Sequence, residues 1–275
     1  MIQENLIFDF GLHKGEDTDF YLRKGFDVVA FEADPDLTAY CAERFYAEIE
    51  QGRLRIIEGA ITNEPNNGLV SFYKNTQNTV WGTTSPGWAE RNKNKFGADS
   101  IRIDVKSIDV TDVFDRYGIP LYMKIDIEGA DVHVLRALRN YSDRPHYLSM
   151  EAEKVNFEKL VAELDLLTDL GYRRFKAVQQ ETIPNSRIRT RTRTGQEFDY
   201  TFVSEASGPF GDDLERPWLR YEECLREYRR IFMSYRLFGD TSPIRRLRIG
   251  RHLLSTAVRL CNRPLPGWYD THAAL

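Results

Sequence analysis

The residues that could do chemistry begin where the first apolar run ends. Asp9 precedes a turn containing Gly11, His13 and Gly15, and an amphipathic segment follows. Glycines in such a turn let backbone amides approach a ligand, and the next helix points its N-terminus at that ligand. Glu32 ends the second apolar run, about 20 positions after Gly11, where nucleoside-binding folds place a ribose-binding carboxylate. The arrangement predicts a nucleoside cofactor, and a tight turn without a ligand is the alternative.

Two kinds of nucleoside cofactor, a dinucleotide and S-adenosylmethionine, could bind at this turn. A dinucleotide requires the spacing Gly-x-Gly-x-x-Gly, which Gly11 and Gly15 do not provide. S-adenosylmethionine has no phosphate, and an acidic residue before the turn suits its charged amino group. Asp9 occupies that position, so the sequence favours S-adenosylmethionine.

Three charged residues alternate at the end of a later apolar run. Lys124, Asp126 and Glu128 are therefore expected on one face of a strand, where packing alone does not explain three charges. Methyl transfer from a sulfonium requires a positioned acceptor, and a hydroxyl acceptor benefits from a base. The hypothesis is that Asp126 lies beside the sulfonium, that Glu128 or Asp126 is the base, and that Lys124 orients them. An internal salt bridge is the alternative.

Carboxylates at strand ends are also suited to magnesium. Asp126, Glu128, Glu151 and Glu153 could supply oxygen ligands of the kind that magnesium prefers. Nothing in their spacing requires a metal ion, so we predict none.

The elements that must position these residues alternate between strand and helix. The predicted strands cover residues 6–10, 28–31, 54–57, 69–73, 101–107, 122–127 and 146–151. The predicted helices cover residues 17–24, 37–51, 130–140 and 156–170. Residues 172–179 and 198–204 are expected to pair as the final two strands. This alternation is typical of an α/β fold with a parallel sheet covered by helices on both faces.

Two polar segments show no regular spacing of apolar residues that would indicate a buried helix or strand. Residues 75–100 contain Trp81 and Trp88, and a long irregular segment is often a lid over a functional site. The tryptophans would either offer flat apolar surfaces to an acceptor or anchor the segment to the core. In residues 187–193 Arg alternates with Ile or Thr, which favours a solvated hairpin over a grip on an anionic acceptor.

The chain changes character near residue 205. From Glu205 onward, 12 Arg and no Lys stand against 9 acidic residues, although the whole chain carries a net charge of −4. Residues 218–238 and 243–260 have a helical, Arg-rich pattern. We therefore expect a domain at 1–205 and a helical C-terminal extension at 206–275. The extension would cap the domain or contact a second copy, another partner or a membrane surface.

Composition and charge limit the class of protein. With 41% hydrophobic and 12% aromatic residues, a largely disordered chain is excluded. The slightly acidic balance counts against nucleic acid as a partner. Cys41, Cys224 and Cys261 lie too far apart for a disulfide framework or a zinc pattern. We see no signal peptide and no membrane span, so a cytoplasmic location is expected.

Four motifs together resemble the FkbM-type methyltransferases, which are class I S-adenosylmethionine-dependent enzymes. They are Asp9-x-Gly11-x-x-x-Gly15, Phe31-Glu32-Ala33-Asp34-Pro35, Glu58-Gly59-Ala60 and Met123-Lys124-Ile125-Asp126-Ile127-Glu128-Gly129-Ala130. The resemblance covers roughly residues 5–205. It implies a Rossmann-like, seven-stranded, mostly parallel sheet whose last strand is antiparallel, with the cofactor at the carboxyl ends of the first strands.

The resemblance also implies which residues hold the cofactor. They are Asp9, Gly11 and Gly15 at the methionine part, Glu32 at the ribose, and Gly59 and Ala60 at the adenine. His13 departs from the pattern, because many class I enzymes have a glycine there. It either contacts the cofactor or bonds to nearby backbone. The expected reaction is O-methylation of a small-molecule or carbohydrate acceptor; methylation of nucleic acid and a non-catalytic binding module are the alternatives.

Overall fold

The computed structural model describes residues 2–62, 68–127, 129–238 and 267–275. The chain divides into two compact units, one of residues 1–148 with 187–200 and one of residues 149–186 with 201–275. The domain boundary expected at residue 205 stays a prediction. Residues 243–260, for which a second C-terminal helix is predicted, lie outside the described part.

The first unit is built on four parallel strands. They are β1 (Ile2–Phe10), β2 (Asp27–Glu32), β3 (Leu54–Glu58) and β7 (Ile119–Ile125), paired in the order β3-β2-β1-β7. Ile7, Phe8 and Phe10 have no exposed surface, which is why β1 appears in the sequence as a continuous apolar run. The strand predictions for this part of the chain are confirmed.

The helices of the first unit follow the strands in alternation. Those outside residues 75–100 are α1 (Glu16–Arg23), α2 (Pro35–Arg44), α3 (Tyr46–Glu50), α5 (Val110–Tyr117) and α6 (Asp131–Leu138). The single helix predicted at 37–51 is wrong, because Phe45 leaves the helical conformation (φ −109°, ψ 28°) and divides α2 from α3. The Phe45 side chain is buried at this break, so tertiary packing interrupts a locally helical pattern.

The second unit contains β8 (Tyr147–Glu151) from Ser149 onward, together with α7 (Phe157–Asp169), β9 (Arg174–Gln179), α8 (Tyr221–Phe238) and β12 (Tyr269–Ala274). The predicted pairing of residues 172–179 with 198–204 is wrong, because β9 pairs antiparallel with β12 instead. Residues 198–201 belong to β11 (Glu197–Thr201), which pairs with β10 (Arg187–Arg191) in a separate two-stranded sheet. The predicted C-terminal extension therefore contains a sheet strand as well as a helix.

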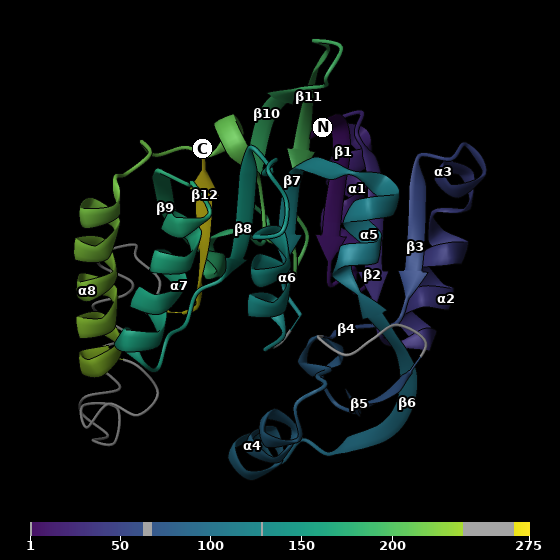
Figure 1. The fold of residues 1–275 in the computed structure, drawn as a ribbon, viewed down its shortest axis with the longest axis horizontal. Coiled ribbons are helices and arrows are strands. Elements are labelled where there is room, and N and C mark those ends of the chain that lie inside the picture. Colours follow the sequence, from purple (N-terminus) through teal and green to yellow (C-terminus); the bar gives the residue numbers. More distant parts are fainter. Residues whose placement is uncertain (1, 63–67, 128, 239–266) are drawn as a thin grey trace. The chain divides into compact units, whose positions relative to one another are not determined.

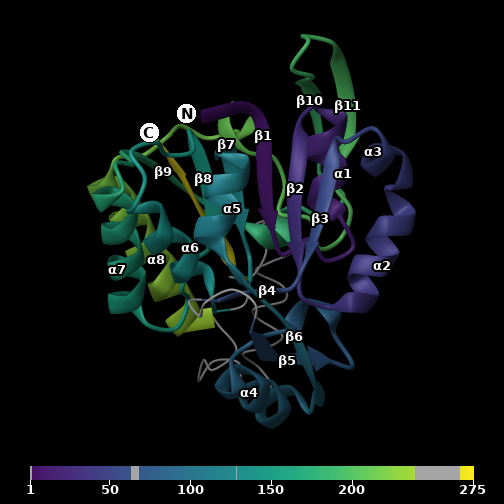
Figure 2. The same cartoon turned by 45° about the vertical axis from the view of Figure 1, so that its right-hand side comes forward.

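The main sheet has seven strands in the order β3-β2-β1-β7-β8-β12-β9. Helices lie on both of its faces (Figures 1 and 2). The predicted Rossmann-like α/β fold with a mostly parallel sheet is confirmed, and the antiparallel strand is supplied by the last residues of the chain.

A small three-stranded sheet extends from the carboxyl ends of β1 to β3 (Figure 1). Its strands are β4 (Ala60–Thr62), β6 (Ser100–Asp109) and β5 (Leu69–Asn75), in that order. Its core consists of Ala60, Phe72 and Val105, against which partly buried apolar residues pack. The strands predicted at 69–73 and 101–107 are confirmed.

Residues 75–100 are more regular than their sequence suggests. They contain a 3₁₀ turn, η1 (Thr79–Trp81), and a helix, α4 (Pro86–Phe96), that ends at Gly97. The buried side chains of α4 include Ala89 and Asn92, which give no apolar period. This composition explains why no helix is predicted there.

Candidate functional site

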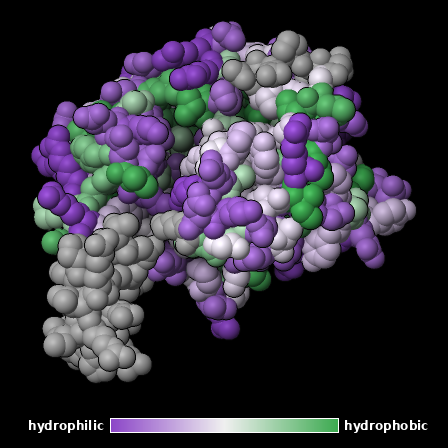
Figure 3. Space-filling view, turned by 90° about the horizontal axis from the view of Figure 1, so that it is seen from below, coloured by the Kyte–Doolittle hydropathy of each residue, from purple (hydrophilic) through white to green (hydrophobic). Residues whose placement is uncertain are grey.

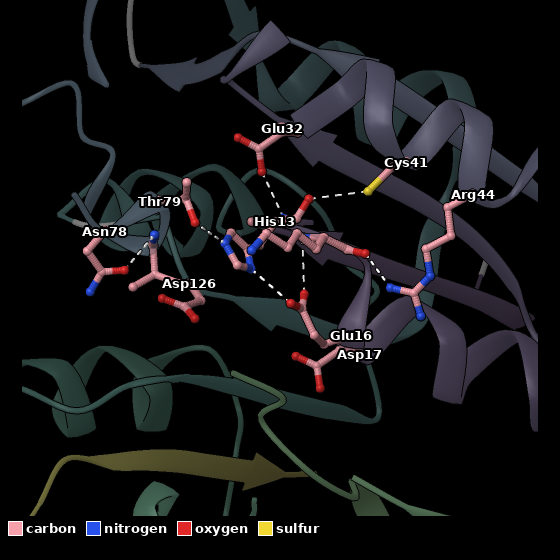
Figure 4. Close-up of polar contacts among 12 residues, drawn as sticks. His13, Glu16, Asp17, Glu32, Cys41, Arg44, Asn78, Thr79 and Asp126 are labelled. Atoms are coloured by element: carbon pink, nitrogen blue, oxygen red, sulfur yellow. Dashed lines mark hydrogen bonds and ion pairs between the residues drawn. The ribbon is translucent and has the colours of Figure 1, made fainter. Parts of the chain in front are cut away.

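The carboxyl ends of β1, β2, β3 and β7 bring together most of the residues that the sequence singles out. Figure 4 shows three of them, His13, Glu32 and Asp126. Backbone hydrogen bonds join these ends, from Gly11 N to Phe31 O at 3.1 Å, from Gly59 N to Glu32 O at 2.8 Å and from Asp126 N to Phe10 O at 2.9 Å. Parallel strands that end at one edge create the usual ligand site of an α/β fold.

Gly11 and Gly15 have left-handed backbones, with φ angles of 95° and 81°. A Cβ atom on Gly11 would lie 2.1 Å from the Asp126 carbonyl oxygen, and one on Gly15 would lie 2.3 Å from the Phe45 ring. Both positions thus require glycine for reasons internal to the chain. Their contact with a cofactor stays a prediction.

Gly59 and Ala60 lie where the chain leaves β3 for β4. A Cβ atom on Gly59 would lie 2.7 Å from the Lys106 carbonyl oxygen, and Ala60 is part of the core of the small sheet. Their proposed place beside an adenine ring stays a prediction.

Glu32 is buried at the end of β2 and accepts two backbone hydrogen bonds. Its two carboxylate oxygens each lie 2.8 Å from a backbone nitrogen, Oε1 from that of Asp34 and Oε2 from that of His13. Burial raises the pKa of Glu32, although these N–H groups favour its ionised form. The position at the strand end is the one expected of a ribose-binding carboxylate.

His13 connects three parts of the first unit (Figure 4). Its ring nitrogens lie 3.1 Å (Nδ1) from Glu16 Oε1 and 2.7 Å (Nε2) from Thr79 Oγ1. Its carbonyl oxygen accepts a hydrogen bond from the buried thiol of Cys41, whose pKa burial raises to about 12. The ring therefore bonds to two side chains, those of Glu16 and Thr79, and its contact with a cofactor stays a prediction.

Lys124 is the centre of a group of carboxylates, the Lys124 cluster, which comprises Lys124, Asp9, Asp17 and Asp126. Lys124 Nζ lies 3.4 Å from Asp9 Oδ1, 3.4 Å from Asp17 Oδ2 and 3.8 Å from Asp126 Oδ2. It also donates a 3.0 Å hydrogen bond to the Gly11 carbonyl oxygen. Three carboxylates thus surround one ammonium group.

Burial divides the Lys124 cluster into an inner and an outer part. The side chains of Asp9, Asp17 and Lys124 are 0%, 3% and 7% exposed, whereas that of Asp126 is 48% exposed. Burial alone would lower the pKa of Lys124, but the three carboxylates outweigh it and hold that pKa well above its ordinary value. The internal salt bridge considered as the alternative is present, and Asp126 is its solvent-facing member.

Asp9 is further from solvent than the sequence suggests. Burial raises the pKa of the Asp9 carboxyl group, while Lys124 and a 2.7 Å hydrogen bond from Thr18 Oγ1 favour the ionised form. With no exposed surface, Asp9 lies behind Lys124, and its direct contact with a cofactor stays a prediction.

Glu128 lies outside the described residues, so its predicted role as a base stays a prediction. Its neighbour Gly129 lies beside α4, because a Cβ atom there would be 3.5 Å from Trp88 Nε1. The Arg91 guanidinium carbon stands 4.5 Å from the centre of the Trp88 ring system. Trp81 packs on Phe96 of the same segment with 4.8 Å between ring centres, so contact with an acceptor and anchoring to the core both stay predictions for the tryptophans.

Sequence reasoning missed Asp17, Thr18 and Thr79. Acidic residues in the first turn of a helix usually complement the helix dipole, so nothing local links Asp17 to Lys124. Thr79 lies in a segment without a period, and its contact with His13 spans 66 positions. Only the folded chain brings these residues to the site.

Two arginines of β10 form ion pairs with carboxylates of β11. Arg189 Nε lies 2.8 Å from Asp199 Oδ1 and Arg191 Nη2 lies 2.7 Å from Glu197 Oε1, with all four side chains exposed. The favoured interpretation of residues 187–193 as a solvated hairpin is confirmed.

Exposed large apolar side chains include Tyr46, Leu69 and Val155, and on the face that Figure 3 shows hydrophobic residues form small groups among hydrophilic ones. Within the described ranges, no helix has the length and apolarity needed to cross a membrane. The same residues contain no group of three or more His, Cys, Asp or Glu side chains that could hold a metal ion.

Comparison with known proteins gives one match at the level of sequence families. A model described as the methyltransferase FkbM domain matches residues 9–174, a range that includes every predicted cofactor residue. No curated protein sequence matches the chain.

Several solved structures are similar to this chain at low identity. A methyltransferase FkbM from Methylobacillus flagellatus KT has 16% identity and a TM-score of 0.39, over 64% of this chain and 40% of that one. A SAM dependent methyltransferase from Archaeoglobus fulgidus has 11% identity and a TM-score of 0.37, over 99% and 87%. A precorrin-6y C5,15-methyltransferase from Geobacter metallireducens GS-15 has 10% identity and a TM-score of 0.35, over 73% and 77%.

Proposed function

Because the chain belongs to the FkbM methyltransferase family, we propose that it transfers a methyl group from S-adenosylmethionine to a hydroxyl oxygen of a small-molecule or carbohydrate acceptor. The observation that carries the proposal is the Lys124 cluster at the carboxyl edge of the sheet. Three carboxylates and one ammonium group give this edge an excess of negative charge. A cofactor with both a sulfonium and an ammonium group is a chemical match for that excess.

The residues at this edge fit S-adenosylmethionine in two further respects. Glu32 presents a carboxylate at the end of β2, and its oxygens keep lone pairs beyond the two backbone hydrogen bonds that they accept. Asp126 is the exposed member of the Lys124 cluster, so it is the carboxylate that a ligand would meet first. The structure thus supports Glu32 for the ribose and Asp126 beside the sulfonium.

The proposed methyl transfer releases one proton from the acceptor hydroxyl, and a group at this edge of the sheet must accept it. When bound, S-adenosylmethionine would supply a methyl group on a positively charged sulfur; the methyl–sulfur bond would break as the acceptor oxygen takes the methyl group, and S-adenosylhomocysteine would leave. The acceptor hydroxyl loses its proton as the new bond forms, and Asp126 is positioned to accept that proton. Lys124 Nζ lies 3.8 Å from Asp126 Oδ2, so it can orient that carboxylate toward the acceptor. Asp9 and Asp17 in turn hold Lys124 in place.

The substitution Asp126→Asn tests this assignment. We expect transfer of labelled methyl from S-adenosylmethionine to a panel of sugars and small hydroxyl compounds to fall by about 10²- to 10⁴-fold, the usual contribution of a base. Glu43→Gln, an exposed carboxylate on α2, is the matched control and should keep full activity. Turnover of Asp126→Asn near that of the unaltered protein would remove Asp126 from the mechanism.

Calorimetry tests the cofactor separately from the acceptor. The unaltered protein should bind S-adenosylmethionine and should not bind NAD. Binding of NAD alone, or of neither, would overturn the proposed cofactor. Binding of S-adenosylmethionine without transfer to any acceptor would favour a non-catalytic module.

A further inference from the structure

His13 contacts both sides of the candidate site through different atoms. Its backbone N–H donates to Glu32, the carboxylate proposed for the ribose, at 2.8 Å. Its ring contacts Thr79 in the segment of residues 75–100, which the sequence predicts to be a lid. One residue thus connects the cofactor carboxylate to the segment above the site.

The backbone of His13 is suited to this double contact. Its φ angle of 51° is left-handed, a conformation that residues other than glycine adopt rarely and that Asn, Asp and His tolerate best. In this conformation the His13 N–H donates to Glu32, and the His13 ring lies within hydrogen-bond distance of Thr79.

Glu16 fixes the orientation of the His13 ring. Burial disfavours the charged form of Glu16, but its hydrogen bonds, with that to His13 the strongest, help to lower its pKa, so Glu16 accepts and does not donate. His13 Nδ1, 3.1 Å from Glu16 Oε1, must therefore carry a proton. In the neutral ring Nε2 is then an acceptor, and the Thr79 hydroxyl donates to it across 2.7 Å.

Thr79 is itself held in a defined position. Asn75 Oδ1 accepts hydrogen bonds from the backbone nitrogens of Gln77 and Asn78, at 3.0 and 2.8 Å. Asn78 Oδ1 accepts one from Val80 N at 3.3 Å, which caps η1. These hydrogen bonds hold the turn that contains Thr79, so a displacement of His13 would move the whole turn and not the Thr79 side chain alone.

We propose that His13 is a positioning residue that couples cofactor binding at Glu32 to the placement of residues 75–100 over the acceptor side, through its hydrogen bond with Thr79. The proposal rests on the proposed function, because it assigns Glu32 to the cofactor. Coupling of this kind is reciprocal, so a cofactor that orders the His13 turn strengthens the Thr79 contact, and loss of that contact weakens cofactor binding.

The test uses S-adenosylhomocysteine, which has the same nucleoside but no methyl group to transfer. In the unaltered protein, adding it should slow amide hydrogen exchange in residues 75–97. Thr79→Val removes the hydroxyl at nearly constant volume and should abolish that slowing, whereas Thr79→Ser keeps a hydroxyl and should restore it.

Thr76→Val is the matched control for Thr79→Val. The Thr76 hydroxyl donates to Asp99 O at 3.0 Å, a bond that does not involve His13. Thr76→Val should therefore respond to S-adenosylhomocysteine as the unaltered protein does. Equal loss in both variants would mean that the segment was loosened in general, and it would overturn the proposal.

Calorimetry supplies a second readout. Thr79→Val should bind S-adenosylhomocysteine roughly 2- to 10-fold more weakly, the range expected for one hydrogen bond. His13→Asn keeps a residue that tolerates the left-handed backbone but is too short for Thr79, and it should weaken binding to a similar extent. If the two act through one bond, the double variant should be no weaker than either single variant.

The outcomes separate this proposal from the proposed function. No binding of S-adenosylhomocysteine by the unaltered protein would count against the proposed cofactor. Binding that is unchanged in Thr79→Val, or additive losses in the double variant, would overturn the coupling and leave the proposed function standing.

Discussion

At the scale of single residues, Lys124 holds one positive charge among the carboxylates of Asp9, Asp17 and Asp126. The first two carboxylates are buried with it, and only Asp126 reaches solvent. A buried charge is tolerated only where it is paired. The ammonium group of Lys124 therefore stabilises the fold by pairing with Asp9 and Asp17. In the proposed function it also orients Asp126.

Lys124→Met should destabilise the protein because it leaves Asp9 buried without its ammonium partner. Removing one member of a buried ion pair typically costs about 3–5 kcal/mol, which urea denaturation would measure. Lys93→Met breaks an exposed pair with Asp99 and should change the free energy of unfolding by less than about 1 kcal/mol.

The double variant Asp9→Asn/Lys124→Met provides a check on the cause. It removes both charges, so it should recover part of the lost stability. If Lys124→Met costs no more than Lys93→Met, the Lys124 cluster does not stabilise the folded protein.

At the scale of elements, the turn from β1 into α1 and the break between α2 and α3 are linked. The Phe45 ring at the break occupies the space where a side chain on Gly15 would be. The turn can therefore approach α2 only because position 15 has no side chain. This contact fixes the turn that carries His13.

Gly15→Ala should destabilise the protein more than Gly25→Ala. Both glycines have positive φ angles, of 81° and 88°, so both variants carry a backbone cost of about 1–2 kcal/mol. Only at Gly15 would the new Cβ atom overlap a ring, since the nearest atom at Gly25 is 4.0 Å away. The overlap should add about 1–3 kcal/mol in thermal or urea unfolding. Equal costs would show that Phe45 moves aside freely.

At the scale of the whole molecule, the last residues of the chain complete the main sheet. In β12, His272 is buried and its Nε2 atom has no hydrogen-bond partner among the described residues. Burial, with a smaller contribution from Lys176, lowers the pKa of His272 to about 3. The folded protein therefore holds a neutral histidine that the unfolded chain protonates below its ordinary pKa of 6.5.

This difference predicts how stability depends on pH. Between about pH 6.5 and pH 3 the unfolded state binds the extra proton, so His272 should remove about 1.4 kcal/mol of stability for each unit that the pH falls. Above pH 6.5 the contribution vanishes. His272→Leu should show a weaker loss of stability in acid, measured by urea unfolding at pH 7, 5 and 4. An acid profile identical to that of the unaltered protein would contradict the prediction.

The elements that could be predicted from the sequence are those with a local pattern of apolar residues. The strands before Glu32 and Asp126 were predictable, because buried parallel strands appear as continuous apolar runs. The helix α4 was not, because it buries Ala89 and Asn92 rather than an apolar stripe. Strand β12 was not either, since its buried residues Thr271, His272 and Ala273 lack the apolar pattern of a strand.

The sequence by itself determined the α/β alternation, the family and the placement of Asp9, Glu32 and Asp126 at the ends of strands, because apolar runs and the turns that follow them are local features. The tertiary structure alone decided that Asp9 and Asp17 share Lys124, that His13 meets Thr79, and that β12 pairs with β9. Each of these contacts joins residues that are far apart in the chain or separated by a turn. The spacing of apolar residues along the sequence does not predict such contacts, because only the packing of the folded chain brings the partners together.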